Sequence, residues 1–318
     1  MSRVRKAVIT AAGRGTRHFP VTQLMQKEMI PLVDRDGTTK PTIQIILEEA
    51  LDAGIEEFCL VISPRTEDQF RAHFNGLPPA QAAAARSSWV QEENERLCDL
   101  GARIRYVVQE QQEGYGHAVY CARDFVGDEP FLLLLGDHIL ISSTKTPCSR
   151  QVIHVYQEHD APVTGVQRTR SDLLHLFGTL AGRRIPGEGL TYEVTTICEK
   201  PSVEFAEEHL RVAGLARDEY LCFFGAHAFP PSLFDAIQYH IRNNIREQGE
   251  IQLTNSLELL RREGRYLATE IDGDRYDMGV PMGYLQTQLA LALNSPARRQ
   301  LLSALPHLVA QTAPDEIR

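Results

Sequence analysis

Short, continuous apolar runs separated by helical patterns are the feature that most restricts how this chain can fold. Three such runs, at 58–63, 104–109 and 131–135, lie in the first half of the sequence, and the last reads FLLLL. Residues 42–53 instead carry apolar side chains at helical spacing. A strand that is apolar on both faces needs cover on both faces, as in a parallel sheet between two helical layers. The pattern predicts an α/β fold with a Rossmann-like, doubly wound, mostly parallel sheet flanked by helices.

The second half of the chain is less regular and predicts a smaller portion with its own strands and helices. Strand-like runs at 193–198 and 220–229 precede a predicted helix over 254–263. A further helix is expected over 282–293, and residues 295–318 predict one more amphipathic helix with a polar end. The sequence contains no internal repeat and no long linker. We therefore expect one compact unit with a C-terminal helical appendage.

Residues 76–100, rich in Ala, Gln and Glu, predict a surface helix after a loop. Trp89 is the one tryptophan of the chain and lies in this segment. We expect Trp89 to anchor the helix on the core rather than to stack on a base.

The charge balance excludes one class of partner. The 318 residues include 42 acidic and 33 basic side chains, which gives a formal net charge of −9. A surface that coats DNA or RNA is normally basic, so we expect no nucleic-acid partner. An acidic protein can still bind phosphate groups if it gathers a few cations in one place.

The six cysteines are scattered and form no Cys-x-x-Cys pair, which excludes a recognisable zinc or disulfide framework. The apolar run at the N-terminus is too short for a signal peptide, and no later run reaches the length of a membrane span. These features predict a protein of the reducing cytoplasm without a membrane partner.

A glycine-rich segment, AAGRGTR at 11–17, directly follows the first predicted strand at 4–10. Small residues let backbone N–H groups approach a phosphate, and Arg17 adds a forked cation. Spacing excludes a Walker A loop, and it excludes the dinucleotide fingerprint because position 18 is His18 rather than Gly or Ala. A tight connection between a strand and a helix would explain the two glycines equally well.

Lys27, in the segment QKEMIPL at 26–32, is the next cation along the chain. It is either a solvated surface charge or a partner of Arg17 in holding a triphosphate.

The run KAVITAAGRGTRHFPVTQLMQKEMIPLVD resembles the signature of the sugar-1-phosphate nucleotidyltransferase family, and within it the bacterial UTP–glucose-1-phosphate uridylyltransferases. The resemblance covers residues 4–293, because later segments are similar to further motifs of the family and follow in the family's order. These segments are EGYGHAVYCA (113–122), LLLLGD (132–137), CEKP (198–201), GEIQLTN (249–255) and YDMGVPMGYLQ (276–286).

The chain departs from the family pattern at several positions. Gln23 replaces a lysine, Gln26 replaces a proline, and His138 stands where a second aspartate is frequent. The segment YLCFFGAH at 220–227 stands where Gly-Arg-Tyr is common, and the usual stretch after Glu-Lys-Pro is missing. Most of these changes touch the expected sugar side.

The resemblance implies a transfer of the uridylyl group of UTP to glucose 1-phosphate, with release of pyrophosphate. A phosphate monoester, with a second pKa of about 6, is mostly dianionic at neutral pH, so its oxygen can attack the α-phosphorus without a general base. The protein must instead neutralise charge. Arg17 and Lys27 are expected to serve the triphosphate and Lys200 the sugar phosphate, and these three are the candidate catalytic residues.

Two aspartates are candidate ligands of Mg²⁺. Asp137 ends the most apolar predicted strand, at the edge where ligands of such sheets bind, and Asp277 lies in the turn YDMG. Mg²⁺ takes one or two protein carboxylates and keeps several waters. A role in a cap or a turn is the structural alternative for each aspartate.

The resemblance also assigns residues to the substrates. For the sugar phosphate these are Gly178, Glu199 and Lys200. Gln109, at the end of a strand-like run, can donate to a pyrimidine carbonyl and accept from its N3–H. The expected nucleotide-binding residues are Ala11, Ala12, Gly13, Gly15, Thr16, Arg17, Lys27, Gln109 and Gly114.

Three further residues stay open. His117 either starts a helix or touches phosphate, and Arg14 is a surface charge with a possible phosphate contact. Glu250 either assists the sugar site or caps the helix that follows.

We expect a catalytic domain at 1–294, with its nucleotide part at 1–150 and its sugar-phosphate part at 151–294, followed by a helical tail at 295–318. UTP and glucose 1-phosphate are the expected partners, and we expect a homo-oligomer. A thymidylyltransferase, a uridylyltransferase for another sugar 1-phosphate and a non-catalytic ligand-sensing homologue are the alternatives.

Overall fold

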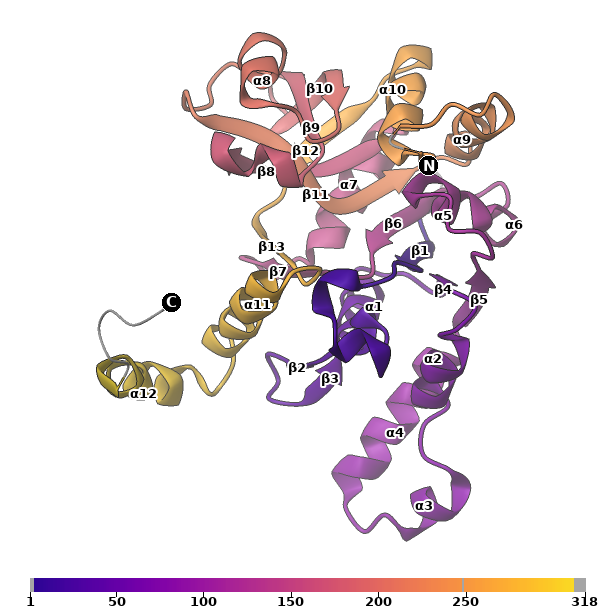
Figure 1. Ribbon diagram of the computed structural model, residues 1–318, viewed down its shortest axis with the longest axis vertical. Helices are drawn as coiled ribbons and strands as arrows, with labels where there is room; N and C mark the ends of the chain where they lie inside the picture. Colours follow the sequence, from indigo (N-terminus) through magenta and orange to yellow (C-terminus); the bar gives the residue numbers. More distant parts are fainter. Residues whose placement is uncertain (1–2, 248, 312–318) are drawn as a thin grey trace.

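The computed structural model describes residues 3–247 and 249–311, and Figure 1 shows their arrangement around one twisted sheet. The sheet has nine strands in the order β5-β4-β1-β6-β11-β8-β12-β10-β9. Strands from both halves of the sequence therefore share a single sheet. The strands are β1 (Lys6–Ala11), β4 (Glu57–Ile62), β5 (Ile104–Val108), β6 (Phe131–Leu135), β8 (Val163–Arg170), β9 (Thr179–Arg184), β10 (Thr191–Cys198), β11 (Glu219–Phe229) and β12 (Leu267–Glu270).

The predicted parallel sheet is confirmed for the first half of the chain, where β5, β4, β1 and β6 all run parallel. The second half differs. β11 is antiparallel to both β6 and β8, and β10 is antiparallel to β12 and β9. The sheet as a whole is therefore mixed: four neighbouring parallel strands lie on one side, and β8 and β12 form a further parallel pair beyond β11.

Helices cover both faces of the sheet, as the doubly wound pattern predicts. Along β4, Phe58, Leu60 and Ile62 pack into one apolar cluster, whereas Cys59 and Val61 pack into the other. Each fully buried side chain of this size stabilises the fold by about 1.5–3 kcal/mol. One face is covered by α1 (Thr42–Asp52), α2 (Glu67–Phe74), α4 (Ser88–Gly101) and α7 (Cys148–His159). The other is covered by α5 (Tyr115–Cys121), α6 (Arg123–Val126), α8 (Val203–His209), α9 (Leu233–Arg242) and α10 (Leu253–Glu263).

Two small antiparallel ribbons complete the neighbourhood of the main sheet. One pairs β2 (Pro31–Val33) with β3 (Thr39–Pro41), and the other pairs β7 (His138–Ser142) with β13 (Gly273–Asp277). The second ribbon joins segments that lie far apart in the sequence. It places the end of β13 beside the turn that follows β6.

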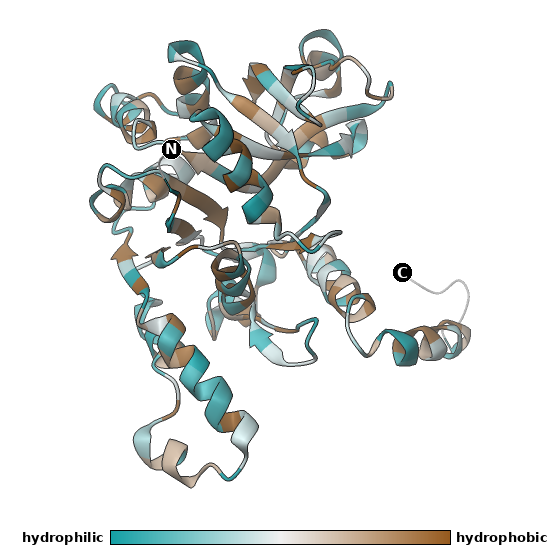
Figure 2. Cartoon of the chain, turned by 180° about the vertical axis from the view of Figure 1, so that it is seen from behind, coloured by the Kyte–Doolittle hydropathy of each residue, from teal (hydrophilic) through white to brown (hydrophobic). Residues whose placement is uncertain are grey.

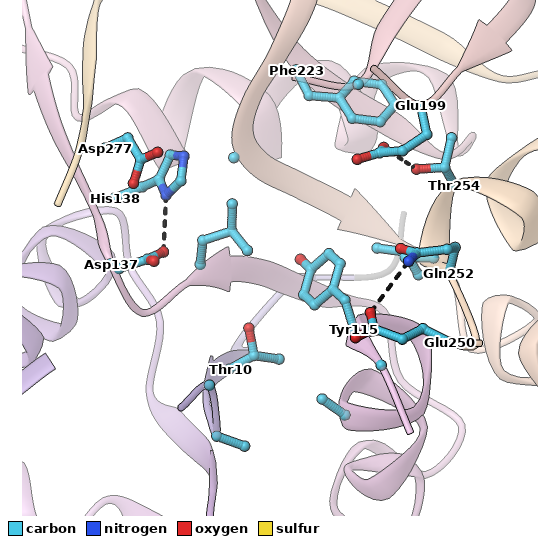
Figure 3. Close-up of a pocket in the computed structure, with 18 of the residues that line it drawn as sticks. Thr10, Tyr115, Asp137, His138, Glu199, Phe223, Glu250, Gln252, Thr254 and Asp277 are labelled. Carbon is cyan, nitrogen blue, oxygen red and sulfur yellow. Dashed lines mark hydrogen bonds and ion pairs between the residues drawn. The ribbon is translucent and has the colours of Figure 1, made fainter. Parts of the chain in front are cut away.

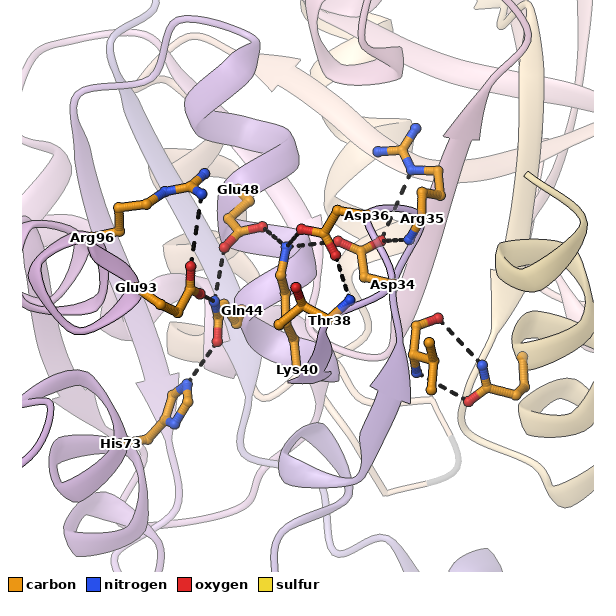
Figure 4. A network of polar contacts seen from close by, with 12 residues as sticks. Asp34, Arg35, Asp36, Thr38, Lys40, Gln44, Glu48, His73, Glu93 and Arg96 are labelled. Carbon is orange, nitrogen blue, oxygen red and sulfur yellow. Dashed lines mark hydrogen bonds and ion pairs between the residues drawn. The ribbon is translucent and has the colours of Figure 1, made fainter. Parts of the chain in front are cut away.

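A buried ion network holds the β2–β3 ribbon against α1. Figure 4 shows the ammonium of Lys40 in contact with three carboxylates. It lies 2.9 Å from Asp34, 2.7 Å from Asp36 and 2.7 Å from Glu48. Burial would lower the pKa of Lys40, but these three carboxylates outweigh that effect and raise it. A buried cation with three such partners keeps its charge.

The C-terminal helices α11 (Pro281–Leu293) and α12 (Arg298–Gln311) leave the sheet, and α12 lies apart from the rest of the chain (Figures 1 and 2). The predicted terminal helix is thus confirmed for residues 298–311, and 312–318 lie outside the described residues. Leu302 and Leu308 of α12 are exposed in the single chain.

The prediction for Trp89 is wrong. Its side chain is 56% exposed on α4, which contacts the core through Leu100 instead. The segment before α4 also contains a short helix, α3 (Pro79–Ala84). All six cysteines are free thiols, as expected. Within 3–247 and 249–311, no helix combines the length and the apolar character that crossing a bilayer requires.

Candidate functional site

A cavity of about 720 Å³ opens at the carboxyl ends of the parallel strands. Gln109 follows β5 directly and Asp137 lies two residues after β6, so both candidate residues line the cavity at the sheet edge where ligands are expected. Figure 3 shows Asp137, His138 and Asp277 on one side of this cavity and Glu199, Phe223 and Thr254 on the other. The cavity therefore has two walls of different chemistry.

The glycine-rich loop after β1 forms part of the first wall. Ala12, Gly13, Thr16 and Arg17 line the cavity. Gly15 has a left-handed backbone (φ 63°) and starts the short helix η1 (Thr16–His18), so it shapes the loop rather than lining the cavity. Two of the predicted nucleotide-binding residues, Ala11 and Gly15, are thus not among the lining residues.

Gln26, which stands where the family has proline, braces this loop. Its buried side-chain amide donates to the carbonyl of Ala11 at 3.1 Å and to that of Gly13 at 2.7 Å. A proline could not make these bonds. Ala11 therefore contributes its carbonyl to the loop's support, while its side chain packs in the core.

Lys27 begins the short helix η3 (Lys27–Met29), and its side chain lines the cavity. Its Nζ lies 2.5 Å from Oδ2 of Asp137 and 3.6 Å from Oε1 of Glu28. A Cβ atom on Gly13 would lie 3.3 Å from the same Nζ, so the absence of a side chain there leaves room for the ammonium. The charge pair joins the loop after β1 to the turn after β6.

This cluster keeps its charges. Burial alone would raise the pKa of Asp137, but the Lys27 ammonium and His138 outweigh it and hold that pKa well below its ordinary value. Burial would lower the pKa of Lys27, but Asp137 and Glu28 raise it above its ordinary value. Burial raises the pKa of Glu28 to about 7, although Lys27 opposes the effect. Both the cation and the anion of the central pair are therefore present at neutral pH.

The β7–β13 ribbon brings the second predicted metal ligand to the first. Its register places Asp277 opposite His138, whose Nδ1 lies 3.0 Å from Oδ1 of Asp137. One ligand atom from each of Asp137, His138 and Asp277 all lie within 4.8 Å of one another. A carboxylate-rich group of this size fits a divalent cation.

Gly279, next to Asp277, keeps this region open. Its N–H donates to Oδ1 of Asp277 at 2.6 Å. A Cβ atom on Gly279 would lie 2.8 Å from Nη2 of Arg17 and 3.0 Å from Oδ2 of Asp137. The guanidinium of Arg17 therefore reaches the same space as the two aspartates, and all five charged groups predicted for the reaction line one cavity.

Gln109 sits at the end of the cavity near α5. It is buried, and its Nε2 contacts the carbonyl oxygen of Gly114 at 3.2 Å and Nδ1 of His117 at 3.1 Å. The two N–H groups of the amide are thus engaged within the protein, and Oε1 is the group left to accept from a base. His117 does not line the cavity; its Nδ1 contacts Gln109, and its Nε2 lies 3.9 Å from Oε2 of Glu113.

Gly114 itself must be glycine. Its φ is 111°, and a Cβ atom would lie 2.7 Å from Cβ of Glu250 and 2.8 Å from the carbonyl oxygen of Ile251. Glu250 lines the cavity and accepts a hydrogen bond from Gln252 at 3.3 Å. Arg14 is exposed on the cavity rim and donates to Gln112 at 2.6 Å.

The opposite wall carries the predicted sugar-phosphate residues, which the structure brings together. Oε2 of Glu199 accepts from the hydroxyl of Thr254 at 2.7 Å, and Lys200 lies 3.7 Å from Oε1 of Glu199. Lys200 has a left-handed backbone (φ 43°) and its side chain is 56% exposed. A Cβ atom on Gly178 would lie 2.5 Å from the ring of Phe223, so only glycine fits there.

Sequence reasoning missed several lining residues. Glu28 and Thr254 lie inside quoted motifs, KEM and LTN, and their neighbours in those motifs were the available signal. His138 differs from the residue that is frequent in the family, and that difference gave no indication that it lines the cavity. Tyr115 likewise lies inside the quoted segment EGYGHAVYCA. Gln112 carried no signal, because its position depends on a long-range contact with the carbonyl of Ala12.

Comparisons with known proteins agree with this geometry. The family model for nucleotidyl transferases matches residues 6–292. A UTP–glucose-1-phosphate uridylyltransferase of Bacillus subtilis is 35% identical over 95% of this chain and 96% of its own, and one of Staphylococcus haemolyticus is 34% identical over 95% and 97%.

Solved structures show the same fold. A UDP-glucose pyrophosphorylase complexed with UDP-glucose superposes with a TM-score of 0.72 at 27% identity, covering 90% of this chain and 98% of that one. A UDP-glucose pyrophosphorylase of Acinetobacter baumannii gives 0.76 at 25% identity, covering 96% and 99%. The chain belongs to the nucleotidyl transferase family.

Proposed function

We propose that this chain transfers the uridylyl group of UTP to glucose 1-phosphate and releases pyrophosphate. Relatives named UTP–glucose-1-phosphate uridylyltransferase match nearly the whole chain at 34–36% identity. The observation that carries the proposal is the distribution of charge: Arg17 and Lys27 line one wall of a single cavity and Lys200 lines the other. Two anionic substrates need cations on both sides of the bond that forms between them.

The proposed chemistry is an in-line displacement. An oxygen of the sugar phosphate attacks the α-phosphorus of UTP, the bond to the β-phosphate oxygen breaks, and pyrophosphate leaves. The nucleophile is already dianionic at neutral pH, since its second pKa is about 6. Lys200 holds it, while Arg17 and Lys27 bind the triphosphate and offset the charge that develops on the leaving group.

Members of this family typically use a divalent cation. We propose Mg²⁺, held by Asp137 and Asp277, because hard carboxylate oxygens suit it and one or two protein ligands suffice. When bound, the cation would neutralise phosphate charge and orient the triphosphate. The residues fit, since the two carboxylates already lie within one group of donors at the cavity wall.

Substrate positions follow from the two walls. We propose that uracil lies between the loop at Gly13 and Gly114, with its N3–H donating to Oε1 of Gln109. The sugar lies against Gly178, where its hydroxyls donate to Glu199. The hydroxyl of Thr254 already orients that carboxylate. On this proposal the nucleotide part of the catalytic domain is 1–150 and the sugar part 151–294.

We further propose a cytoplasmic homo-oligomer. The free thiols suit a reducing compartment. The exposed Leu302 and Leu308 of α12 supply an apolar surface that a second copy would cover. Light scattering on the full chain tests this, and a monomer at all concentrations would contradict it.

The test of the function is direct. The full chain with UTP, glucose 1-phosphate and Mg²⁺ is expected to form UDP-glucose and pyrophosphate in equal amounts. A panel of sugar 1-phosphates then identifies the preferred sugar. Absence of product with every sugar phosphate and every nucleoside triphosphate would support a non-catalytic homologue.

A further inference from the structure

His138 stands between the two proposed metal ligands. It follows Asp137 in the sequence and lies opposite Asp277 in the β7–β13 ribbon. Two ligands each about 2.1 Å from one ion are at most about 4.2 Å apart. The observed limit of 4.8 Å for the three donors therefore requires shifts of less than an ångström.

The imidazole is held in place before any cation arrives. Its side chain is 12% exposed, and Nδ1 contacts Oδ1 of Asp137 at 3.0 Å. Gly225, where the register of β11 is interrupted, has φ 87°, and a Cβ atom there would lie 3.3 Å from Cδ2 of His138. The glycine thus makes the room that the ring occupies. Little side-chain entropy remains to be lost on binding.

A second observation points to a cation at this wall. Glu28 is 1% exposed and lines the cavity, and its Oε2 has no hydrogen-bond partner among the described residues. A buried carboxylate oxygen without a partner is costly. One ammonium, that of Lys27, faces the carboxylates of both Glu28 and Asp137, at 3.6 Å and 2.5 Å.

We infer that His138 is a third protein ligand of the divalent cation and shifts the preference of the centre from Mg²⁺ toward Mn²⁺ and Co²⁺. This rests on the proposed function, which places the cation at Asp137 and Asp277. Carboxylate and water oxygens suit Mg²⁺, whereas an imidazole nitrogen favours first-row transition metals. An aspartate at this position would supply an oxygen instead. Histidine in place of aspartate at position 138 therefore changes the donor atom from oxygen to nitrogen but keeps the number of donors.

Pulsed electron paramagnetic resonance of bound Mn²⁺ tests this, because a coordinated imidazole gives a ¹⁴N coupling. The full chain is loaded with Mn²⁺, alone and with inorganic pyrophosphate. We expect the coupling in the unmodified chain, and its loss in His138→Asp and in His138→Asn. The matched control is His154→Ala, since the side chain of His154 is 64% exposed on α7 and does not line the cavity.

Metal affinities give the second readout. Loss of even an outer partner of a metal ligand costs about tenfold or more in affinity. We expect His138→Asp to reduce the preference for Mn²⁺ over Mg²⁺ by at least about tenfold, measured by titration calorimetry. An unchanged preference, or a ¹⁴N coupling that persists in His138→Asp, would show that His138 solely orients Asp137.

The two proposals fail separately. Pyrophosphate release with Mg²⁺ but no ¹⁴N coupling in the Mn²⁺-loaded chain overturns the role of His138 alone. Absence of nucleotidyl transfer with Mg²⁺, Mn²⁺ and Co²⁺ overturns the proposed function. No binding of Mn²⁺, even with pyrophosphate, counts against the metal centre as a whole.

Discussion

The ammonium of Lys27 lies 2.5 Å from a carboxylate oxygen of Asp137 and joins the loop after β1 to the turn after β6. Each partner holds the other in its charged form. The free protein therefore keeps the cation that we propose for phosphate binding and the anion that we propose for metal binding paired with each other. On the proposed function, a triphosphate and a divalent cation would take over these two charges together, since each alone would leave a buried charge less well compensated.

Asp137→Asn is expected to reduce the rate of pyrophosphate release by about a hundredfold or more. The variant keeps the shape of the side chain but removes the charge that would hold the cation and pairs Lys27. Steady-state kinetics with UTP and glucose 1-phosphate measures the effect. Asp274→Asn, an exposed change on the same strand as Asp277, is the control. Turnover of Asp137→Asn near that of the control would contradict the role of Asp137.

Lys200→Ala is expected to raise KM for glucose 1-phosphate far more than KM for UTP. Loss of a charge-assisted contact costs about 1.5–3 kcal/mol, or about ten- to a hundredfold. Lys200 lies beside Glu199 and Lys27 beside Asp137, and Figure 3 shows these two carboxylates on opposite sides of the cavity. The two substrates should therefore respond differently. Lys145→Ala, at an exposed loop position, is the control. An effect confined to UTP would reverse the proposed division between the walls.

Much of the fold is predictable because local chemistry encodes it. The continuous apolar runs of β4 and β6 need cover on both faces, and that need favours a parallel sheet between helices. The run that forms β11 is equally apolar, yet its direction depends on its partners β6 and β8, which no local pattern records. The sequence therefore left the direction of β11 open.

The site shows the same division. Arg17 and Lys27 follow motifs that are contiguous in the sequence. In contrast, the approach of Asp277 to His138 depends on the pairing of β13 with β7. The local sequence also gives no sign that Trp89 is exposed, because α4 packs on the core through Leu100 instead. Long-range pairing and packing thus set what the sequence alone left undetermined.

Gln109→Ala is expected to reduce the preference for UTP over CTP by about ten- to a hundredfold. Both N–H groups of the amide are engaged within the protein, so Oε1 would read the N3–H of uracil, and cytosine has no proton there. A buried unpaired polar group costs about 1–3 kcal/mol. The ratio of kcat/KM for the two nucleotides measures the effect. Gln111→Ala, an exposed neighbour, should leave the ratio unchanged; an equal fall in both variants would exclude base reading by Gln109.

Glu28→Gln is expected to be more stable, compared with the unmodified chain, at high pH than at low pH. Burial raises the pKa of Glu28 from 4.5 to about 7, so between these values the native state binds more protons than the unfolded state. The free energy of unfolding therefore falls as pH rises through this window, by a total on the order of 3 kcal/mol. Glutamine does not titrate and escapes this loss.

Thermal unfolding in EDTA at about pH 5 and about pH 8 measures the effect of Glu28→Gln. The difference in Tm between variant and unmodified chain should increase in favour of the variant at the higher pH. Glu263→Gln, at an exposed position, is the control and should show no such change. If the difference in Tm between Glu28→Gln and the unmodified chain were the same at both pH values, the pKa of the Glu28 carboxyl would not be raised in the folded protein.

Nucleotide preference tests the uridylyl assignment most directly. The measurement is kcat/KM for UTP, dTTP, CTP, ATP and GTP with glucose 1-phosphate at saturating Mg²⁺. We predict the highest value for UTP, a lower value for dTTP, whose paired edge is the same as that of uracil, and values for CTP about ten- to a hundredfold below UTP. ATP and GTP should be poorer still, because a purine needs a wider slot between Gly13 and Gly114. A preference for ATP or GTP would contradict the account, even if pyrophosphate were released.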